Sequence, residues 1–267
     1  MNVCGTQVHV GAAAERAVLI SDLHVGGAGD DVCASLASAV DHACGHADAL
    51  FVLGDLFDSY VSRAQVRVGV WRDVAARFAA AAARGLRVVV MVGNRDFLLG
   101  DEFARASGVE LVHGGYRAPI GGVDTLLLHG DELCQNDLPY QRAKRWLRHP
   151  VTRAVARSLP LPIARWAAER ARKKSQAVIV SGDQSRFLPS ERAVAAACEV
   201  GARRLVFGHI HRRSAGQFGE AEYHVLPAFD EHGGGLLVSP GRCEELRFGG
   251  GEPQASAGAA PACPWSP

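Results

Sequence analysis

The sequence predicts an α/β fold in which two sheets pack face to face, helices cover the outside, and a helical segment is inserted late in the chain. Short apolar runs typical of buried strands alternate with helical patterns, and further short apolar runs follow them. Alternating strands and helices followed by strands favour this α/β/β/α layering. A chain of 267 residues can form one large domain and still carry an insertion.

The expected elements follow in chain order. Strands are predicted at 17–20, 49–53, 87–92, 125–128 and 204–207, and antiparallel strands at 223–226 and 236–239. Helices are predicted at 31–43, 66–84, 101–107 and 190–198. Gly85 suits the position after the end of the second helix, and Ser190 suits the start of the last.

Two regions break this alternation. Residues 139–175 form the predicted insertion, which Pro150, Pro160 and Pro162 should divide into several short helices. The tail, 249–267, is rich in Gly, Ala, Pro and Ser, and we expect it to be disordered. The core domain is therefore predicted to consist of residues 1–138 and 176–248.

The net charge of +1 conceals a local excess of cations. Between 142 and 174 the only acid is Glu169, whereas eleven residues are basic: Arg142, Lys144, Arg145, Arg148, Arg153, Arg157, Arg165, Arg170, Arg172, Lys173 and Lys174. Such a concentration predicts contact with an anionic partner.

Cysteine usage and hydropathy indicate the compartment. Seven scattered cysteines without a C-x-x-C pair suit a reducing cytoplasm better than a disulfide framework. The first residues lack the pattern of a signal peptide, and no apolar stretch approaches the roughly 20 residues that cross a bilayer. We expect a cytoplasmic protein that at most rests on a membrane surface.

Polar blocks follow the five predicted core strands. They are Ser21-Asp22-Leu23-His24, Gly54-Asp55-Leu56-Phe57-Asp58, Gly93-Asn94-Arg95-Asp96, His129-Gly130-Asp131 and Gly208-His209-Ile210-His211. Strand ends hold such side chains rigidly around a shared crevice. Each block alone could be turn or cap chemistry, but turn chemistry does not require the histidines. Asp, Asn and His without thiolate favour Mn²⁺, Mg²⁺ or Fe²⁺.

In this order, the blocks resemble those of the calcineurin-like metallophosphoesterases. The resemblance implies that Asp22, His24, Asp55 and His211 hold one divalent ion, and that Asp55, Asn94, His129 and His209 hold a second. Asp55 would bridge two ions about 3.5–4 Å apart, which is the spacing that supports phosphoryl transfer. We expect two Mn²⁺ ions and a hydroxide nucleophile.

Arg95 stands where many members of this superfamily carry a histidine that protonates the leaving group. A guanidinium keeps its proton, so Arg95 can bind phosphate but cannot be a general acid. An enzyme without that acid suits a leaving group that is already good, which favours a pyrophosphate bond over an ordinary phosphate ester. A water or another side chain could supply the proton instead.

The segment from His129 through Cys134 to Tyr140, together with the blocks at Gly54 and Gly93, is similar to the UDP-2,3-diacylglucosamine diphosphatases of lipid A biosynthesis over about 17–212. The resemblance implies attack on the α-phosphorus, giving UMP and 2,3-diacylglucosamine 1-phosphate. It assigns catalysis to Asp55, Asn94 and Arg95, and substrate contacts to Asn94, Arg95, Asp131, Tyr140, Ser175 and His209. The insertion would be a lid for the acyl chains at the inner-membrane surface; no nucleic acid or obligate protein partner is implied.

Departures from that family leave alternatives open. Residues 59–63 lack its usual aromatic and acidic pair, and 176–182 contain no lysine. The same site could hydrolyse another nucleoside-diphosphate-linked or phosphoester substrate, and an apolar tunnel would count against that reading. A non-catalytic binding module would usually have lost metal ligands. A nuclease would need more stacking aromatics than Trp146 and Trp166 in the insertion.

Overall fold

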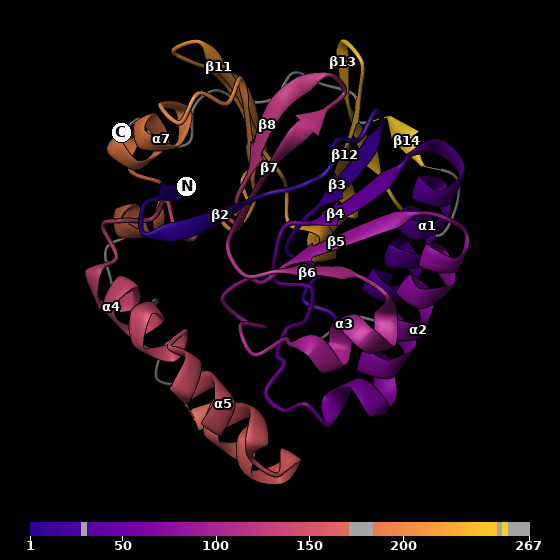
Figure 1. The fold of residues 1–267 in the computed structure, drawn as a ribbon, viewed down its shortest axis with the longest axis vertical. Coiled ribbons are helices and arrows are strands. Elements are labelled where there is room, and N and C mark those ends of the chain that lie inside the picture. The colour runs from indigo at the N-terminus through magenta and orange to yellow at the C-terminus, as the bar shows by residue number, and fades with distance from the viewer. Residues whose placement is uncertain (28–30, 171–183, 250–252, 256–267) are drawn as a thin grey trace.

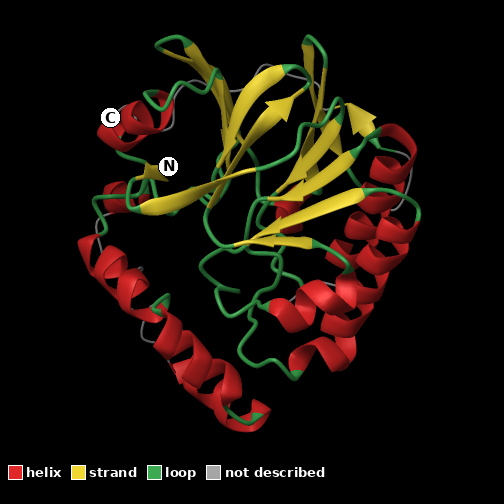
Figure 2. Ribbon diagram, viewed as in Figure 1, coloured by secondary structure: helices red, strands yellow, loops and turns green. Residues whose placement is uncertain are grey.

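A computed structural model describes residues 1–27, 31–170, 184–249 and 253–255 of the chain. Within these residues two seven-stranded mixed sheets pack against each other, and helices cover their outer faces (Figures 1 and 2). The predicted α/β/β/α sandwich is confirmed.

The first sheet has the strand order β14-β13-β12-β3-β4-β5-β6. Its strands are β3 (Ala17–Ile20), β4 (Ala49–Val52), β5 (Arg87–Met91), β6 (Glu110–Val112), β12 (Gly234–Ser239), β13 (Arg242–Arg247) and β14 (Gln254–Ala255). Strands β3 to β6 run parallel, and β12 joins β3 antiparallel. Every residue of β3 and β4 is buried, because the sheet is covered on both faces.

The second sheet has the order β1-β2-β7-β8-β9-β11-β10. Its strands are β1 (Asn2–Val3), β2 (Thr6–Val10), β7 (Gly115–Ile120), β8 (Val123–Leu127), β9 (Arg204–Phe207), β10 (Ser214–Phe218) and β11 (Ala221–Val225). Strand β9 lies parallel to both β8 and β11. This arrangement places the ends of β8 and β9 beside each other.

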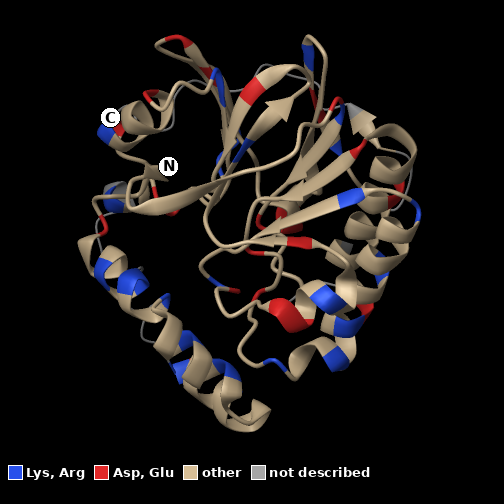
Figure 3. Cartoon of the chain, in the orientation of Figure 1, with Lys and Arg blue, Asp and Glu red and all other residues tan. Residues whose placement is uncertain are grey.

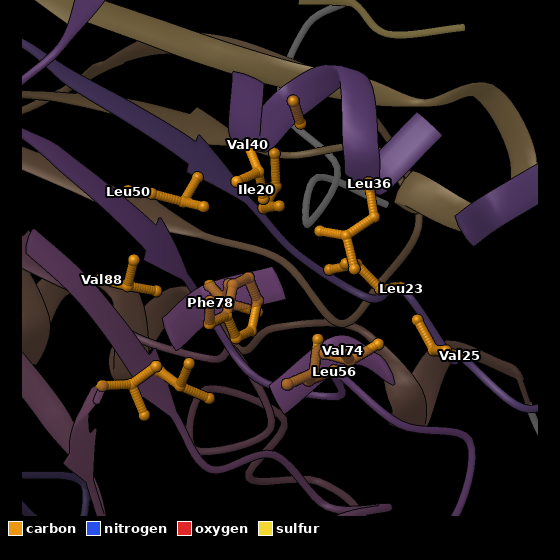
Figure 4. Close-up of a cluster of buried hydrophobic side chains, with 14 of the residues drawn as sticks. Ile20, Leu23, Val25, Leu36, Val40, Leu50, Leu56, Val74, Phe78 and Val88 are labelled. Atoms are coloured by element: carbon orange, nitrogen blue, oxygen red, sulfur yellow. The ribbon is translucent and has the colours of Figure 1, made fainter. Parts of the chain in front are cut away.

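Three layers of apolar side chains hold the sandwich together. The largest lies between the first sheet and helices α1 (Asp31–His46), α2 (Gly69–Ala83) and α3 (Asp101–Ser107), and Figure 4 shows part of it around Phe78. A second layer fills the space between the sheets, with Phe51 facing Tyr116. The third lies between the second sheet and α7 (Glu191–Cys198).

The strand and helix predictions are mostly confirmed within one or two residues, with one clear correction. The helix predicted at 66–84 is a short 3₁₀ helix, η1 (Gln65–Arg67), followed by α2. Val68 is extended between them and Gly69 has a φ of +50°, so the helical path cannot continue through this point. Ser190 caps α7 as predicted, by accepting the N–H of Ala193 at 3.3 Å.

Six strands before the tail were not predicted from the sequence: β1, β2, β6, β7, β10 and β13. Most are polar or interrupted by glycine and proline, so no apolar alternation marks them. The tail predicted to be disordered lies largely outside the described residues. Residues 249 and 253–255 of it are described, and Gln254 and Ala255 pair with β13.

The basic insertion forms a helical arm, defined here as residues 138–170. It consists of α4 (Leu138–Leu147), α5 (Pro150–Ser158) and a helical stretch at 161–170. The breaks at Pro150 and Pro160 are as predicted, but Pro162 makes no break, because it lies in the first turn of the last stretch, where proline is tolerated. Figure 1 shows α4 and α5 running along one side of the molecule, and Figure 3 shows Lys and Arg along both helices. Arg148, Arg153 and Arg157 reach back to the core domain, where they contact Gly93, Leu99 and Glu102. Residues 171–175 of the predicted insertion lie outside the described part of the chain.

Among the described helices, none combines the length and apolar character needed to cross a bilayer.

The packing of α2 predicts the effect of Phe78→Ala. The Phe78 ring is fully buried between α2 and the first sheet, so its removal leaves a cavity and should lower the free energy of unfolding by about 3–5 kcal/mol. Urea unfolding measures this loss. The neighbouring exposed change, Arg77→Ala, should stay within about 0.5 kcal/mol of the starting protein. Equal losses in the two variants would contradict the packing described.

Candidate active site

Five strand ends from both sheets meet at one edge of the sandwich. Strands β3, β4 and β5 of the first sheet and β8 and β9 of the second each run into one of the polar blocks. Parallel strands deliver the residues after their carboxyl ends to the same edge. Two sheets therefore supply one site.

The backbone at this edge is strained at the residues that carry the chemistry. Five of the six described non-glycine residues with positive φ are predicted metal ligands: Asp22 (+57°), His24 (+47°), Asp55 (+51°), His209 (+69°) and His211 (+54°). Non-glycine residues rarely adopt this left-handed conformation, which persists only where the surroundings enforce it and is concentrated at functional sites.

Backbone hydrogen bonds between neighbouring blocks enforce that conformation. The N–H groups of Leu23 and His24 both donate to the carbonyl of Asp55 at 3.0 Å, and the N–H of Asp22 donates to that of Gly54 at 3.2 Å. The block after β3 is therefore fastened to the block after β4. The side chains at this edge point from a rigid frame and not from mobile loops.

Glycines let the blocks approach this closely. A Cβ on Gly93 would lie 2.1 Å from Asp55 Oδ1, and one on Gly208 would lie 2.1 Å from Ser21 Oγ. Neither contact is possible for a larger residue. Gly93 and Gly208 are thus required by the packing of the site, whatever its chemistry.

The side chains form two groups of possible metal ligands. Asp22, His24 and His211 place ligand atoms within 4.8 Å of one another, and Asp22, His129 and His209 do the same. The rings of His24 and His211 lie 5.3 Å apart, and those of His129 and His209 lie 5.0 Å apart.

Asp55 lies between these groups. Its Oδ2 is 3.4 Å from His24 Nε2, and its Oδ1 is 3.8 Å from His129 Nε2. Asn94 completes the second group, with its Oδ1 2.9 Å from His129 Nε2. The structure therefore brings all seven predicted ligands together, with Asp55 placed where a bridging carboxylate would be needed.

Further contacts orient the histidine rings. His24 Nδ1 lies 2.8 Å from Asp230 Oδ2, and His129 Nδ1 lies 2.8 Å from the carbonyl oxygen of Leu53. Each contact leaves Nε2 directed toward the centre of the site, which is the usual arrangement of metal-binding histidines. Asp230 belongs to α8 (Phe229–His232) and was missed in the sequence. The sequence around Asp230 looks like that of an ordinary surface aspartate, because its contact with His24 depends on where α8 packs.

The polar atoms at the centre fit a divalent cation. Asp22 Oδ2 accepts hydrogen bonds from Ser21 Oγ at 2.6 Å and from the His209 N–H at 2.8 Å. Asp22 Oδ1 and His24 Nε2 are both buried without a hydrogen-bond partner among the described residues. Buried polar atoms are rarely left unsatisfied. A cation between them would satisfy both, and the donor set contains no sulfur.

Electrostatics at the centre also favour a cation. Burial acts to raise the pKa of Asp55, but His129 and His24 outweigh it and the pKa is lowered. Burial acts to lower the pKa of His24, but contacts with Asp230 and Asp55 raise it to about 9. Burial also opposes charge on His129, yet Asp55 and Asp22 raise its pKa to about 9. The carboxylates therefore favour positive charge on His24 and His129, whereas burial and the neighbouring His129 lower the pKa of His209 to about 4.

Arg95 lies at the rim of this centre. Its backbone N–H donates to Asp55 Oδ1 at 2.8 Å, and its Nη1 donates to Asp58 Oδ1 at 2.8 Å. Its Nε is 3.7 Å from Asp55 Oδ2, and the side chain is 36% exposed. Asp58 thus holds a guanidinium beside the predicted bridging carboxylate with one side open to solvent.

Asp131, predicted to contact substrate, instead binds the helical arm in this structure. Its carboxylate is fully buried and accepts hydrogen bonds from Tyr140 Oη and from Arg148 Nη2, the latter at 3.3 Å, while Lys144 Nζ lies 2.9 Å away. Residues 140, 144 and 148 follow one face of α4 and its C-terminal cap. The contact of Tyr140 or Asp131 with substrate remains a prediction, and Ser175 lies outside the described residues.

A cavity of about 530 Å³ lies beneath the arm. Its lining includes Lys144, Arg145, Arg148 and Arg153 and no acidic side chain, and Val92 and Phe97 connect it to the Gly93 block. Burial and the charge of Arg153 lower the pKa of the lining residue His113 to about 4. The cavity suits an anionic polar group; it is not the apolar tunnel that a purely hydrocarbon ligand would need.

Large apolar side chains of the arm are exposed, whereas Ala156 packs against the largest apolar layer and Ala164 is buried. Six of the large ones are between 53% and 69% exposed: Leu138, Trp146, Val151, Val155, Ile163 and Trp166. Large apolar groups gathered on one surface element indicate contact with an apolar partner.

Sequence comparisons show the family to which this chain belongs. The profile of the family described as Calcineurin-like phosphoesterase matches residues 15–213. The UDP-2,3-diacylglucosamine hydrolase of Azotobacter vinelandii is 36% identical over 73% of this chain and 81% of its own length. The protein of the same name from Ectopseudomonas mendocina is 31% identical over 83% and 93%. Among solved structures, Yfce, a phosphoesterase from E. coli, superposes with a TM-score of 0.46 at 14% identity, covering 92% of this chain and 98% of that one.

The contact between His24 and Asp230 predicts that Asp230→Asn binds metal more weakly. Loss of the carboxylate partner weakens the ligand, so Mn²⁺ affinity should fall about 10- to 100-fold in calorimetric titration. Asp73→Asn, which changes an exposed aspartate paired with Arg72, is the control and should bind as before. Unchanged affinity in Asp230→Asn would show that His24 needs no such support.

The contacts of Asp131 predict that Asp131→Asn loosens the arm. Breaking a buried ion pair costs about 3–5 kcal/mol, because Lys144 and Arg148 lose the carboxylate that neutralises them. Limited trypsin digestion should cut within the arm at least about tenfold faster. Asp137→Asn makes the same chemical change at the helix cap, where Asn serves equally well, and should not alter the rate.

Proposed function

Because this chain belongs to the calcineurin-like phosphoesterase family and is a metal-dependent hydrolase, we propose that it cleaves the pyrophosphate bond of UDP-2,3-diacylglucosamine, releasing UMP and 2,3-diacylglucosamine 1-phosphate. One observation carries this proposal: a cationic cavity and an arm with exposed apolar side chains both lie beside the carboxylate–imidazole centre. A substrate with a diphosphate and acyl chains needs both surfaces.

The residues of the centre would hold two divalent ions, which we propose to be Mn²⁺. Asp22, His24 and His211 would bind one, Asn94, His129 and His209 the other, and Asp55 both. When bound, such a pair supplies positive charge to the phosphoryl oxygens and an activated water. Asp230 and the carbonyl of Leu53 keep the imidazoles in the orientation that this role requires.

Arg95 would bind the diphosphate through its planar guanidinium. Asp58 pairs with one end of the Arg95 side chain, and Arg95 lies beside Asp55, so its charge would be next to the reacting phosphorus of a bound diphosphate. The leaving sugar 1-phosphate is a stable anion, so Arg95 need not supply a proton. An alkoxide leaving group would need an acid that this residue cannot provide.

The arm would bind the lipid part of the substrate. Its apolar side chains would contact the acyl chains, while its arginines would face phosphate groups of the substrate or of an anionic leaflet. This arrangement supports a cytoplasmic enzyme that works at the inner-membrane surface.

The polar lining of the cavity favours one alternative, a water-soluble nucleoside-diphosphate sugar. Incubating the purified protein and Mn²⁺ with UDP-2,3-diacylglucosamine, and in parallel with UDP-N-acetylglucosamine, separates the two. We expect UMP from the acylated substrate at a rate at least about a hundredfold higher, since an apolar pair of chains contributes several kcal/mol. Equal rates would favour the alternative. Asp55→Ala, which removes the proposed bridge, should release no UMP from either.

The position of Arg95 predicts the effect of replacing it. Arg95→Ala should lower the rate of UMP release by about 10²–10³, as expected when one strong donor to a developing charge is lost. Arg95→His should remain impaired, because the good leaving group gives a new acid nothing to assist. Arg63→Ala changes an exposed arginine elsewhere in the chain; it is the matched control and should retain full activity.

Hydrolysis of an alkyl phosphodiester, which has a poor leaving group, tests whether the leaving group determines which bond the enzyme cleaves. If the unmodified enzyme cleaved that ester as fast as the pyrophosphate, Arg95 would not explain the choice of bond.

A further inference from the structure

A second cluster of possible ligands lies where the two sheets face each other at the β11 and β13 strands, and it shares no residue with the proposed active site. Glu222 and His224 come from β11 of one sheet, and Cys243 comes from β13 of the other. Their ligand atoms all lie within 4.8 Å of one another. No motif in the sequence links the two segments.

The strand registers explain why these side chains meet. Glu222 and His224 are two residues apart, so they project from the same face of β11. Tyr223 and Val225 alternate with them along β11 and face the apolar layer beneath α7. Glu222 and His224 therefore face the opposite sheet. Cys243 pairs with Val238 and packs against the layer between the sheets.

His224 is ready to act as a ligand. Its Nε2 is out of contact with solvent and has no hydrogen-bond partner among the described residues. Burial lowers the pKa of its imidazole, and this influence outweighs that of Glu222. Neutral imidazole is the metal-binding form.

Cys243 and Glu222 complete a mixed donor set. Cys243 is a half-buried thiol without a disulfide partner among the described cysteines. Sulfur, imidazole nitrogen and carboxylate oxygen together select Zn²⁺ and similar ions over the Mn²⁺ or Mg²⁺ that suit an all-nitrogen-and-oxygen site.

Arg204 is the main competitor for Glu222. It is almost fully buried, forms an ion pair with Glu222 through Nε, and donates from Nη1 to the carbonyl of Ile120 at 3.0 Å. It therefore neutralises Glu222 and cannot readily move away. Because Arg204 already neutralises Glu222, the negative charge beside a bound dication would come from the Cys243 thiolate, which forms when the thiol loses its proton.

We propose that Glu222, His224 and Cys243 form a separate site for one thiophilic divalent ion such as Zn²⁺. Binding exchanges the Cys243 S–H bond for a metal–sulfur bond and releases one proton to solvent, with no change in oxidation state. Three protein ligands leave one position of a tetrahedral ion to water. Because the ligands come from both sheets, the ion ties β11 to β13 and stabilises this edge of the sandwich.

Sulfur-to-metal charge-transfer absorption tests this site without interference from the active centre, whose donor set contains no sulfur. The full chain is reduced with a phosphine, saturated with Mn²⁺ and titrated with Cd²⁺. We expect a thiolate–cadmium band that saturates at one ion per chain. The band should disappear in Cys243→Ser, and His224→Asn should weaken Cd²⁺ binding about tenfold or more. Cys198→Ser changes another partly buried cysteine and should keep the band.

The absence of the band in the unmodified protein, or its persistence in Cys243→Ser, would overturn the proposed site. Thermal unfolding tests its structural role. Zn²⁺ added to the Mn²⁺-saturated protein should raise Tm more in the unmodified chain than in Cys243→Ser or His224→Asn, since an ion bound only to the folded state stabilises it. An equal rise in all three would overturn that role. Activity plays no part in either measurement, so failure of the proposed function leaves this test intact.

Discussion

The buried carboxylate of Asp55 is the group around which this molecule is arranged. It lies between His24 and His129, accepts the backbone N–H of Arg95, and adopts a left-handed backbone conformation that its neighbours must enforce. A buried carboxylate is tolerated only when it is paired and hydrogen-bonded. The partners of Asp55 come from strand ends of both sheets, which must therefore meet at one edge. Gly93 allows this, because a larger residue there would collide with Asp55.

A second buried carboxylate, Asp131, connects that centre to the helical arm. It lies two residues after His129 and binds successive turns of α4 through Tyr140, Lys144 and Arg148. Arg148 also donates to the carbonyl of Gly93 at 3.1 Å, beside the predicted ligand Asn94. The position of the arm and the geometry of the centre are therefore coupled through a short chain of ionic contacts. The arm is also held near its other end, by the ion pair of Arg157 with Glu102 and by the hydrogen bond from Ser62 Oγ to the Leu159 carbonyl at 3.2 Å, while its large apolar side chains remain exposed.

The two proposed metal sites differ in their donors for a physical reason. The strand ends supply carboxylate, amide and imidazole groups from a rigid frame and no sulfur, which suits hard to borderline ions such as Mn²⁺. The cluster at β11 and β13 combines a thiol with imidazole and carboxylate between two sheets, which suits an ion that is retained. One chain can thus separate catalytic and structural ions by ligand chemistry alone.

The sequence by itself determined the strands that end in polar blocks, the breaks of the arm at Pro150 and Pro160, and the cap at Ser190, because each depends on periodicity or on backbone preferences within a few residues. The gathering of all seven predicted ligands also followed from the sequence, once parallel strand ends were taken to share an edge. Tertiary structure alone decided three contacts: Asp230 with His24, Asp131 with the helical arm, and His224 with Cys243. These contacts join segments far apart in the chain, so they depend on sheet order, strand register and helix placement, which no local pattern specifies.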